Sequence, residues 1–198
     1  MVKGIYNRQD YVPGRHKNVD TWVGEWNSHV YPSGLKKILS KYDSKLGDVV
    51  LDLGSGPNPL SFSLQNPSKI ILLDIVPQVC SLKKPGKDVK AVWGDLEVMI
   101  GKGTYKSLGN VDSVIASSIF NYVDWRKLID LQSKLHNSDG YFFVANRNKG
   151  SGRGIKRLFS DKSPESDAEV IDYFENSGYK IVEQKQDSNL SILVAKKL

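Results

Sequence analysis

The sequence is poor in cysteine: Cys80 is the only one among 198 residues. One thiol cannot form an internal disulfide or supply a cysteine-based zinc site, so we expect a protein of a reducing compartment, the cytoplasm. Long apolar runs are also missing, since none approaches the ~18 residues that a membrane span needs. The N-terminal stretch MVKGIYNRQDYVPGRHKNVD lacks the apolar centre of a secretory signal. These absences predict a soluble protein with no membrane partner and no metal site.

Charge and hydrophobicity are ordinary for one globular domain. Hydrophobic residues make up 39% and charged residues 25% of the chain, a balance typical of proteins with a single packed core. The net charge is +6, and residues 147–157, RNKGSGRGIKR, concentrate five positive charges without a carboxylate. Such a segment either attracts an acidic acceptor or the phosphates of RNA, or it is a solvated loop. Both interpretations stay open.

Short apolar runs alternate with helical signals from residue 49 onward. Each run is bulky and nearly continuous, as in strands that a parallel sheet buries on both faces. The runs comprise residues 49–53, 70–75, 89–93, 111–116, 141–145, 179–184 and 191–197. A short polar link joins the last two, which favours an antiparallel hairpin. The pattern predicts a doubly wound α/β fold: a seven-stranded, mostly parallel sheet with a reversed last strand and helices on both faces.

Three helices can be placed by apolar spacing and by their caps. Residues 33–42 carry apolar side chains on one face, and residues 124–136 do the same behind Asp124, a good N-cap. His136, at the end of this second helix, is interpreted as a cation that interacts with the helix dipole. The second helix stops before a turn at Ser138-Asp139-Gly140. A capping box at residues 166–169 announces a third helix, which ends at Gly178.

Residues 1–48 differ from the rest, and we treat them as an N-terminal segment that precedes a domain over residues 49–198. A close group of ring-bearing side chains stands before the first helix: Trp22, Trp26, His29 and Tyr31. His29 titrates near neutrality, which suits a base. The competing interpretation is a packing cluster with His29 exposed beside it.

The stretch VVLDLGSGPNP, residues 49–59, places a glycine turn after the first strand. Gly54 and Gly56 allow a tight turn and let a ligand approach the backbone closely. Asn58 and Pro59 fit the first positions of a helix, whose backbone N–H groups would face the ligand. Pro59 also takes the place of the third glycine in the dinucleotide pattern G-x-G-x-x-G, which argues against a pyrophosphate ligand.

Carboxylates accompany three neighbouring strands. Asp52 lies inside the first strand, Asp74 ends the second, and Asp95 follows the third. Ligands of an open parallel sheet bind at this edge, where the strand order reverses. Three carboxylates would repel a triphosphate or a pyrophosphate, but they would accommodate a cationic nucleoside. Any one of them alone would more often be a helix cap or a turn former.

The order and spacing of these motifs resemble those of the class I S-adenosylmethionine-dependent methyltransferases: Asp52-x-Gly54-x-Gly56, then Asp74, then Gly94-Asp95. The resemblance covers about residues 45–198 and implies S-adenosyl-L-methionine as the cofactor. It also implies a binding shell of Asp52, Gly54, Gly56, Asp74, Ile75, Asp95, Leu96 and Ser117. In this shell the glycine turn lines the methionine part, Asp74 holds the ribose hydroxyls and Asp95 accepts from the adenine amino group. Ile75 packs on the adenine, with the Leu96 N–H beside it.

The segment Ser117-Ser118-Ile119-Phe120 follows the fourth strand, where the family flanks the transferable methyl. It lacks the prolines and the leading amide or carboxylate of methyltransferases that act on the adenine amino group, which argues against that acceptor. It is similar to small-molecule methyltransferases, with Tyr122 where many have a histidine. A base is needed only where the acceptor loses a proton, and the candidates are His29, Tyr31 and Tyr122. In related enzymes, a segment such as residues 1–48 lids the pocket.

Three functions follow from this resemblance. The first is a methyltransferase that transfers a methyl group to a small metabolite, anionic ones included. The second is a methyltransferase of rRNA or tRNA, with residues 147–157 guiding the phosphates. The third is a cofactor-binding scaffold without catalysis. The sequence leaves the acceptor atom and the oligomeric state open.

Overall fold

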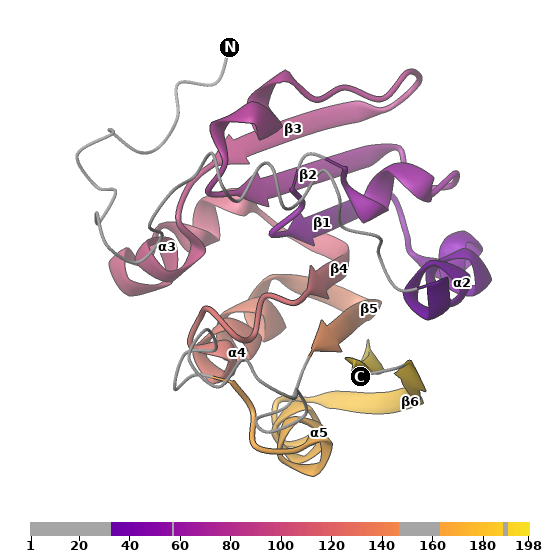
Figure 1. The fold of residues 1–198 in the computed structure, drawn as a ribbon, viewed down its shortest axis with the longest axis vertical. Helices are drawn as coiled ribbons and strands as arrows, with labels where there is room; N and C mark the ends of the chain where they lie inside the picture. The colour runs from indigo at the N-terminus through magenta and orange to yellow at the C-terminus, as the bar shows by residue number, and fades with distance from the viewer. Residues whose placement is uncertain (1–32, 57, 147–162, 188–189) are drawn as a thin grey trace, which may run out of the picture.

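The computed structural model describes residues 33–56, 58–146, 163–187 and 190–198 (Figure 1). Two of the predicted features lie outside these residues. One is the N-terminal aromatic segment with the candidate bases His29 and Tyr31, and the other is the basic stretch 147–157. Their predicted roles are therefore not tested by the structure.

A seven-stranded sheet forms the centre of the fold, with strand order β3-β2-β1-β4-β5-β7-β6 (Figure 1). The first five strands pair in parallel, and β7 runs antiparallel to both β5 and β6. The predicted fold class is confirmed, with the last strand reversed as expected. The strands are β1 Val49–Leu53, β2 Lys69–Asp74, β3 Asp88–Trp93, β4 Val111–Ser117, β5 His136–Asn146, β6 Tyr179–Asp187 and β7 Leu190–Lys197.

Helices cover both faces of the sheet, because strand side chains alternate between two separate cores. The α-helices are α2 Ser33–Tyr42, α3 Leu96–Lys102, α4 Trp125–Leu135 and α5 Asp167–Asn176. Side chains of α3, α4 and α5 pack with Leu51 and Val114 in the larger core. The apolar face of α2 packs with Val50 and Ile115 on the other side. Neighbouring residues of one strand thus pack into the two cores on opposite faces of the sheet.

The glycine turn does not lead into an α-helix, contrary to the prediction. Pro59 precedes η3, a 3₁₀ helix over Leu60–Ser63, and Pro59 makes no side-chain cap. Another 3₁₀ helix, η4 at Pro77–Ser81, is the only helix between β2 and β3 in the described chain. A proline at position 67 leaves few residues for a helix after Pro59, since it disfavours helical backbone before it.

Two predictions around the start of β5 are wrong. The strand already begins at His136, and the expected turn at residues 138–140 is a bulge, because Val111 pairs with His136 and Ser113 with Tyr141. His136 is not a cation at a helix end. Burial lowers its pKa to about 4, so the ring is neutral at pH 7. Its Nε2 lies 2.9 Å from the Asp112 carbonyl oxygen and its Nδ1 lies 3.0 Å from the Tyr179 hydroxyl.

Candidate functional site

The carboxyl ends of β1, β2, β3 and β4 meet at one edge of the sheet (Figure 1). From β1 the chain continues to β2 and β3 on one side, and it then returns to β4 on the other side of β1. The strand order therefore reverses between β1 and β4. Such a switch point is where open α/β sheets bind their ligands.

The glycine turn lies at this point and needs its glycines. Gly54 has a φ of 65° and Gly56 a φ of 60°, both in the left-handed region that disfavours other residues. A Cβ atom on Gly54 would lie 2.6 Å from Cδ1 of Ile119, which comes from the segment after β4. The Gly54 amide donates to the Leu73 carbonyl at 2.8 Å. The turn is thus packed between the ends of β2 and β4.

Asp74 connects the end of β2 to the glycine turn. Its Oδ2 accepts from the Gly56 amide and its Oδ1 from the Val76 amide, each at 2.8 Å. The residue is only 7% exposed. The carboxylate predicted to hold a ribose therefore already organises the backbone around it. Its role as a ligand of the ribose remains a prediction.

Asp52 faces the other layer and anchors η3. Its Oδ2 accepts from the Ser61 amide at 3.0 Å and from the Ser61 hydroxyl at 2.7 Å. Burial raises the pKa of Asp52 to about 6, the nearby Asp74 charge adds to this, and the two Ser61 bonds oppose it. Asp52 is 2% exposed and binds Ser61, so its position suits an anchor of the turn.

The end of β3 is organised by Asp95, the N-cap of α3. Its Oδ1 accepts from the Glu97 amide at 2.9 Å and the Val98 amide at 3.3 Å. The side chain of Leu96, the next residue, packs in the larger core. The half-buried Ile75 is tied to β3 by its carbonyl oxygen, which accepts from Trp93 Nε1 at 2.9 Å. These residues lie side by side at the ends of β2 and β3.

Ser118 is a feature that sequence reasoning missed. It has a φ of 59°, in a region that few residues other than glycine occupy. Its amide donates to the Ala145 carbonyl at 2.6 Å, which fixes it between the ends of β4 and β5. Strained backbone of this kind clusters at functional sites. Nothing in the sequence announces it, because serine has no preference for this conformation. Ser117, the predicted contact before it, is buried.

The residues after Ser118 form the wall beside the turn. Phe120 is fully buried and stacks on Trp125, so it belongs to the core. Asn121 is 1% exposed, and its Oδ1 accepts from the Ser163 hydroxyl at 3.1 Å. Tyr122 is half-buried and packs against the larger core. Of the three predicted bases, Tyr122 is the one that the structure describes, and it lies at the predicted edge.

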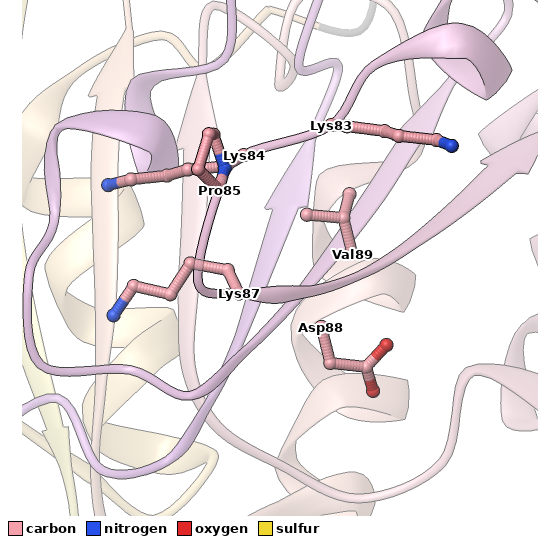
Figure 2. Close-up of a pocket in the computed structure, with 6 residues that line it drawn as sticks. All are labelled: Lys83, Lys84, Pro85, Lys87, Asp88 and Val89. Atoms are coloured by element: carbon pink, nitrogen blue, oxygen red, sulfur yellow. The ribbon is translucent and has the colours of Figure 1, made fainter.

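A cavity of about 530 Å³ lies elsewhere, at the start of β3, and is lined by Lys83, Lys84, Pro85, Lys87, Asp88 and Val89 (Figure 2). Lys84 and Lys87 extend to one side of it, whereas Lys83 extends to the other (Figure 2). β3 begins at the amino ends of the parallel strands, whereas the glycine turn lies at their carboxyl ends. This cavity is therefore not the predicted site.

The described residues offer neither a metal-binding cluster nor a membrane-spanning helix. No cluster of three or more His, Cys, Asp or Glu side chains there could hold a metal ion. No described helix is both long and apolar enough to cross a membrane.

No protein-family model matches the sequence, and no curated protein matches it either. The fold is similar to many solved structures. One is the N-methyltransferase NodS from Bradyrhizobium japonicum WM9 in complex with S-adenosylhomocysteine, with a TM-score of 0.67, 11% identity, and coverage of 93% of this chain and 99% of that one. Another is 1,6-didemethyltoxoflavin-N1-methyltransferase from Burkholderia thailandensis, with a TM-score of 0.58, 12% identity, and coverage of 94% and 92%.

The pyocyanin biosynthetic protein PhzM is a third similar structure, with a TM-score of 0.60 and 18% identity. Here 83% of this chain is covered, but it spans only 54% of the length of PhzM. The identities are low, so these similarities concern the fold. They agree with the strand order and the reversed β7. The chain has the fold of the class I S-adenosylmethionine-dependent methyltransferases.

Proposed function

We propose that the protein is an S-adenosylmethionine-dependent methyltransferase whose acceptor is a small molecule. The observation that carries the proposal is the 2.8 Å contact between Asp74 and the Gly56 amide at the switch point of the sheet. It brings a carboxylate against a glycine turn at the place where this fold takes its ligand. Asp52 and Asp95 add negative charge nearby, which favours a sulfonium nucleoside over a pyrophosphate.

The residues at the strand ends fit this cofactor. Asp74 accepts one backbone N–H at each oxygen, from Gly56 and from Val76. We expect the ribose hydroxyls to donate to this carboxylate, which offers about four lone-pair sites in all. Asp95, by contrast, accepts two amides of α3 at one oxygen, Oδ1, and we expect its other oxygen to accept from the adenine amino group. Gly54 presents no Cβ atom to the ligand.

The bound cofactor would supply an activated methyl group whose leaving group is a neutral thioether. The chain's task is to hold the acceptor in line with that methyl group. The segment after β4 is suited to this, because Ser118 is fixed by the Ala145 carbonyl and Asn121 by the Ser163 hydroxyl. Among the residues that the structure describes, Tyr122 is the candidate base that would remove a proton from the acceptor. His29 and Tyr31 are the further candidates that the sequence supplies.

A small acceptor is supported by two observations. Residues 117–120 lack the features of methyltransferases that act on the adenine amino group. One structural neighbour methylates 1,6-didemethyltoxoflavin, a small molecule. The basic stretch 147–157 follows β5, whose end lies beside that of β4, so an anionic metabolite is a natural first choice of acceptor. An RNA acceptor is the alternative that the same stretch supports, and a non-catalytic scaffold is the third.

Calorimetry with S-adenosylhomocysteine tests the cofactor, and Asp74→Asn is the variant to compare. We expect the wild type to bind and the variant to bind about tenfold to a hundredfold more weakly, because a hydrogen bond to a charged group is lost. Asp88→Asn is the matched control, since Asp88 is exposed at the opposite edge of the sheet. Binding of a nicotinamide dinucleotide without any binding of S-adenosylhomocysteine would refute the proposal.

The acceptor class needs a second measurement. Release of S-adenosylhomocysteine is followed with a panel of small neutral and anionic acceptors and with bulk RNA. Turnover on a small molecule supports the proposal. Turnover on RNA alone, together with an RNA affinity that falls steeply with salt, favours the alternative. Tight cofactor binding without turnover on any acceptor favours the scaffold.

A further inference from the structure

The segment Leu60–Pro67 joins the glycine turn to β2 and has little regular structure of its own. It contains η3, with backbone bonds from the Phe62 amide to the Pro59 carbonyl and from the Leu64 amide to the Ser61 carbonyl, each at 3.1 Å. An α-helix would satisfy its backbone groups internally. Here side chains from other parts of the chain bind them instead.

Two lysines bind the carbonyl oxygens of this segment. Lys84 Nζ donates to the Phe62 carbonyl at 2.5 Å and to the Leu64 carbonyl at 2.6 Å. Lys87 Nζ donates to the carbonyls of Gln65 and, at 2.6 Å, of Pro67. The two ammonium groups lie on the same side of the cavity at the start of β3, away from Lys83 (Figure 2). We call Lys84 and Lys87 the lysine clamp.

Carboxylates bind the amides of the same segment. Asp43 accepts from the Gln65 amide at 3.0 Å and from the Asn66 amide at 3.3 Å. Asp52 accepts from both the amide and the hydroxyl of Ser61. Cations thus bind the carbonyl oxygens and anions bind the amides, so each charge meets the matching end of a peptide dipole.

The clamp lysines differ from Lys83 in burial and in environment. Burial and the nearby Lys87 charge lower the pKa of Lys84, with Asp43 opposing the shift. Lys84 and Lys87 are both half-buried, whereas Lys83 is exposed. The side chains of a surface loop would ordinarily keep their ammonium groups in water. The ammonium groups of both lysines instead bind backbone carbonyls of one segment.

We propose that Lys84 and Lys87 are positioning residues for the cofactor turn, a role that rests on the proposed function. The clamp holds residues 60–67, and Ser61 in that segment binds Asp52, which lies two residues before Gly54. The glycine turn is therefore fixed at both ends: by β1 in the sheet and by a clamped η3. Release of the clamp lets the turn move, so that binding has to order it again.

The test uses the full chain with three variants. Lys84→Met combined with Lys87→Met removes the clamp and keeps much of the apolar stem. Lys84→Arg combined with Lys87→Arg keeps charged donors. Lys83→Met is the matched control, because it removes a neighbouring charge on the other side of the cavity. Each protein is titrated with S-adenosylhomocysteine in a calorimeter, and amide hydrogen exchange is measured without ligand.

We expect the double Met variant to bind S-adenosylhomocysteine about tenfold more weakly, with the arginine pair restoring most of the affinity. Amides of residues 54–56 and 60–66 should exchange faster, while those of β1 and β4 keep their protection. In turnover, KM for S-adenosylmethionine should rise at unchanged kcat, since saturation restores the ordered turn. The Lys83→Met protein should match the wild type throughout.

Unchanged affinity in the double Met variant of a protein that binds would overturn the inference. So would a general loss of protection across the sheet, since the lysines would then serve the fold as a whole. A wild type that does not bind refutes the proposed function instead. In that case amide hydrogen exchange at residues 54–56 tests the inference. An unchanged exchange rate there in the double Met variant overturns it.

Discussion

His136 makes the free energy of unfolding of this protein fall as the pH is lowered from neutrality. Its Nε2 lies 2.9 Å from the Asp112 carbonyl oxygen, which only accepts, so Nε2 carries the proton and Nδ1 accepts from the Tyr179 hydroxyl. Burial lowers the pKa of His136 to about 4, against an ordinary value of 6.5. Because the folded pKa is depressed, the stability is fully present above the unfolded pKa and is lost as the pH falls below it.

The magnitude follows from the two pKa values. Between about pH 7.5 and about pH 5, protonation of the unfolded chain alone lowers the free energy of unfolding by about 2 kcal/mol through His136. Asp52 acts in the opposite direction, since burial raises its pKa to about 6 and the folded state gains stability as the pH falls. Between the same two pH values, the Asp52 contribution raises the free energy of unfolding by about 1 kcal/mol, which offsets part of the loss through His136. The wild type alone would therefore show a shallow slope.

The assay compares urea unfolding of the wild type and of His136→Gln at several pH values between these limits. Asp52 and the other titrating groups are common to both proteins, so the difference in the free energy of unfolding isolates His136. The variant is expected to be less stable near neutrality, because its side chain fits the site of the ring poorly. The difference between the free energies of unfolding of the wild type and the variant should decrease by about 2 kcal/mol toward pH 5. Parallel curves for the two proteins would refute the reasoning.

Two substitutions in the turn and its anchor give further predictions. Gly54→Ala should lower the free energy of unfolding by about 1–3 kcal/mol in urea melts, because of its φ of 65° and the approach of Ile119, while Gly101→Ala in open space should not destabilise. Ser61→Ala should cost about 1–2 kcal/mol near pH 7.5 and less near pH 5, because it removes a bond that favours the Asp52 carboxylate. An equal cost at both pH values would contradict this role of Ser61.

The sheet could be predicted from the sequence because its strands need no information beyond their own residues. A run such as VVLDL is bulky, short and apolar at nearly every position, and only a strand buried on both faces accommodates it. Asp124 and Ser166 likewise announce their helices locally, and both accept from a backbone amide three residues later, as predicted. The position of Asp74 follows from the same local logic, since it ends such a run.

The predictions failed where a residue's state depends on partners that are distant in the sequence. Pro59 looked like a helix start, but the segment after it is satisfied by Lys84, Lys87 and Asp43 from elsewhere. His136 looked like a helix-end cation, but Tyr179 and Asp112 enclose it. Local propensity cannot register such contacts.

The three carboxylates of the site serve two purposes, and this governs how the site should be probed. Asp52, Asp74 and Asp95 each accept backbone or hydroxyl hydrogens from the protein itself, and each thereby fixes the loop that follows or faces its strand. An Asn substitution replaces one acceptor oxygen by a donor, so it disturbs the loop as well as any ligand contact. Loss of affinity in such a variant alone cannot separate the two effects.

A substitution of Ser61 can separate the effect on the loop from the effect on a ligand contact, which substitutions of the carboxylates cannot do. Its hydroxyl donates to Asp52 on the η3 side of β1, so Ser61→Ala alters the anchor while every predicted ligand residue keeps its side chain. At a pH well above the pKa of Asp52, where the carboxylate stays charged in both proteins, a loss of cofactor affinity in Ser61→Ala measures the cost of a loosened turn. Any larger loss in Asp74→Asn then reports the direct contact with the ribose, because Asp74 combines both roles at the switch point of the sheet.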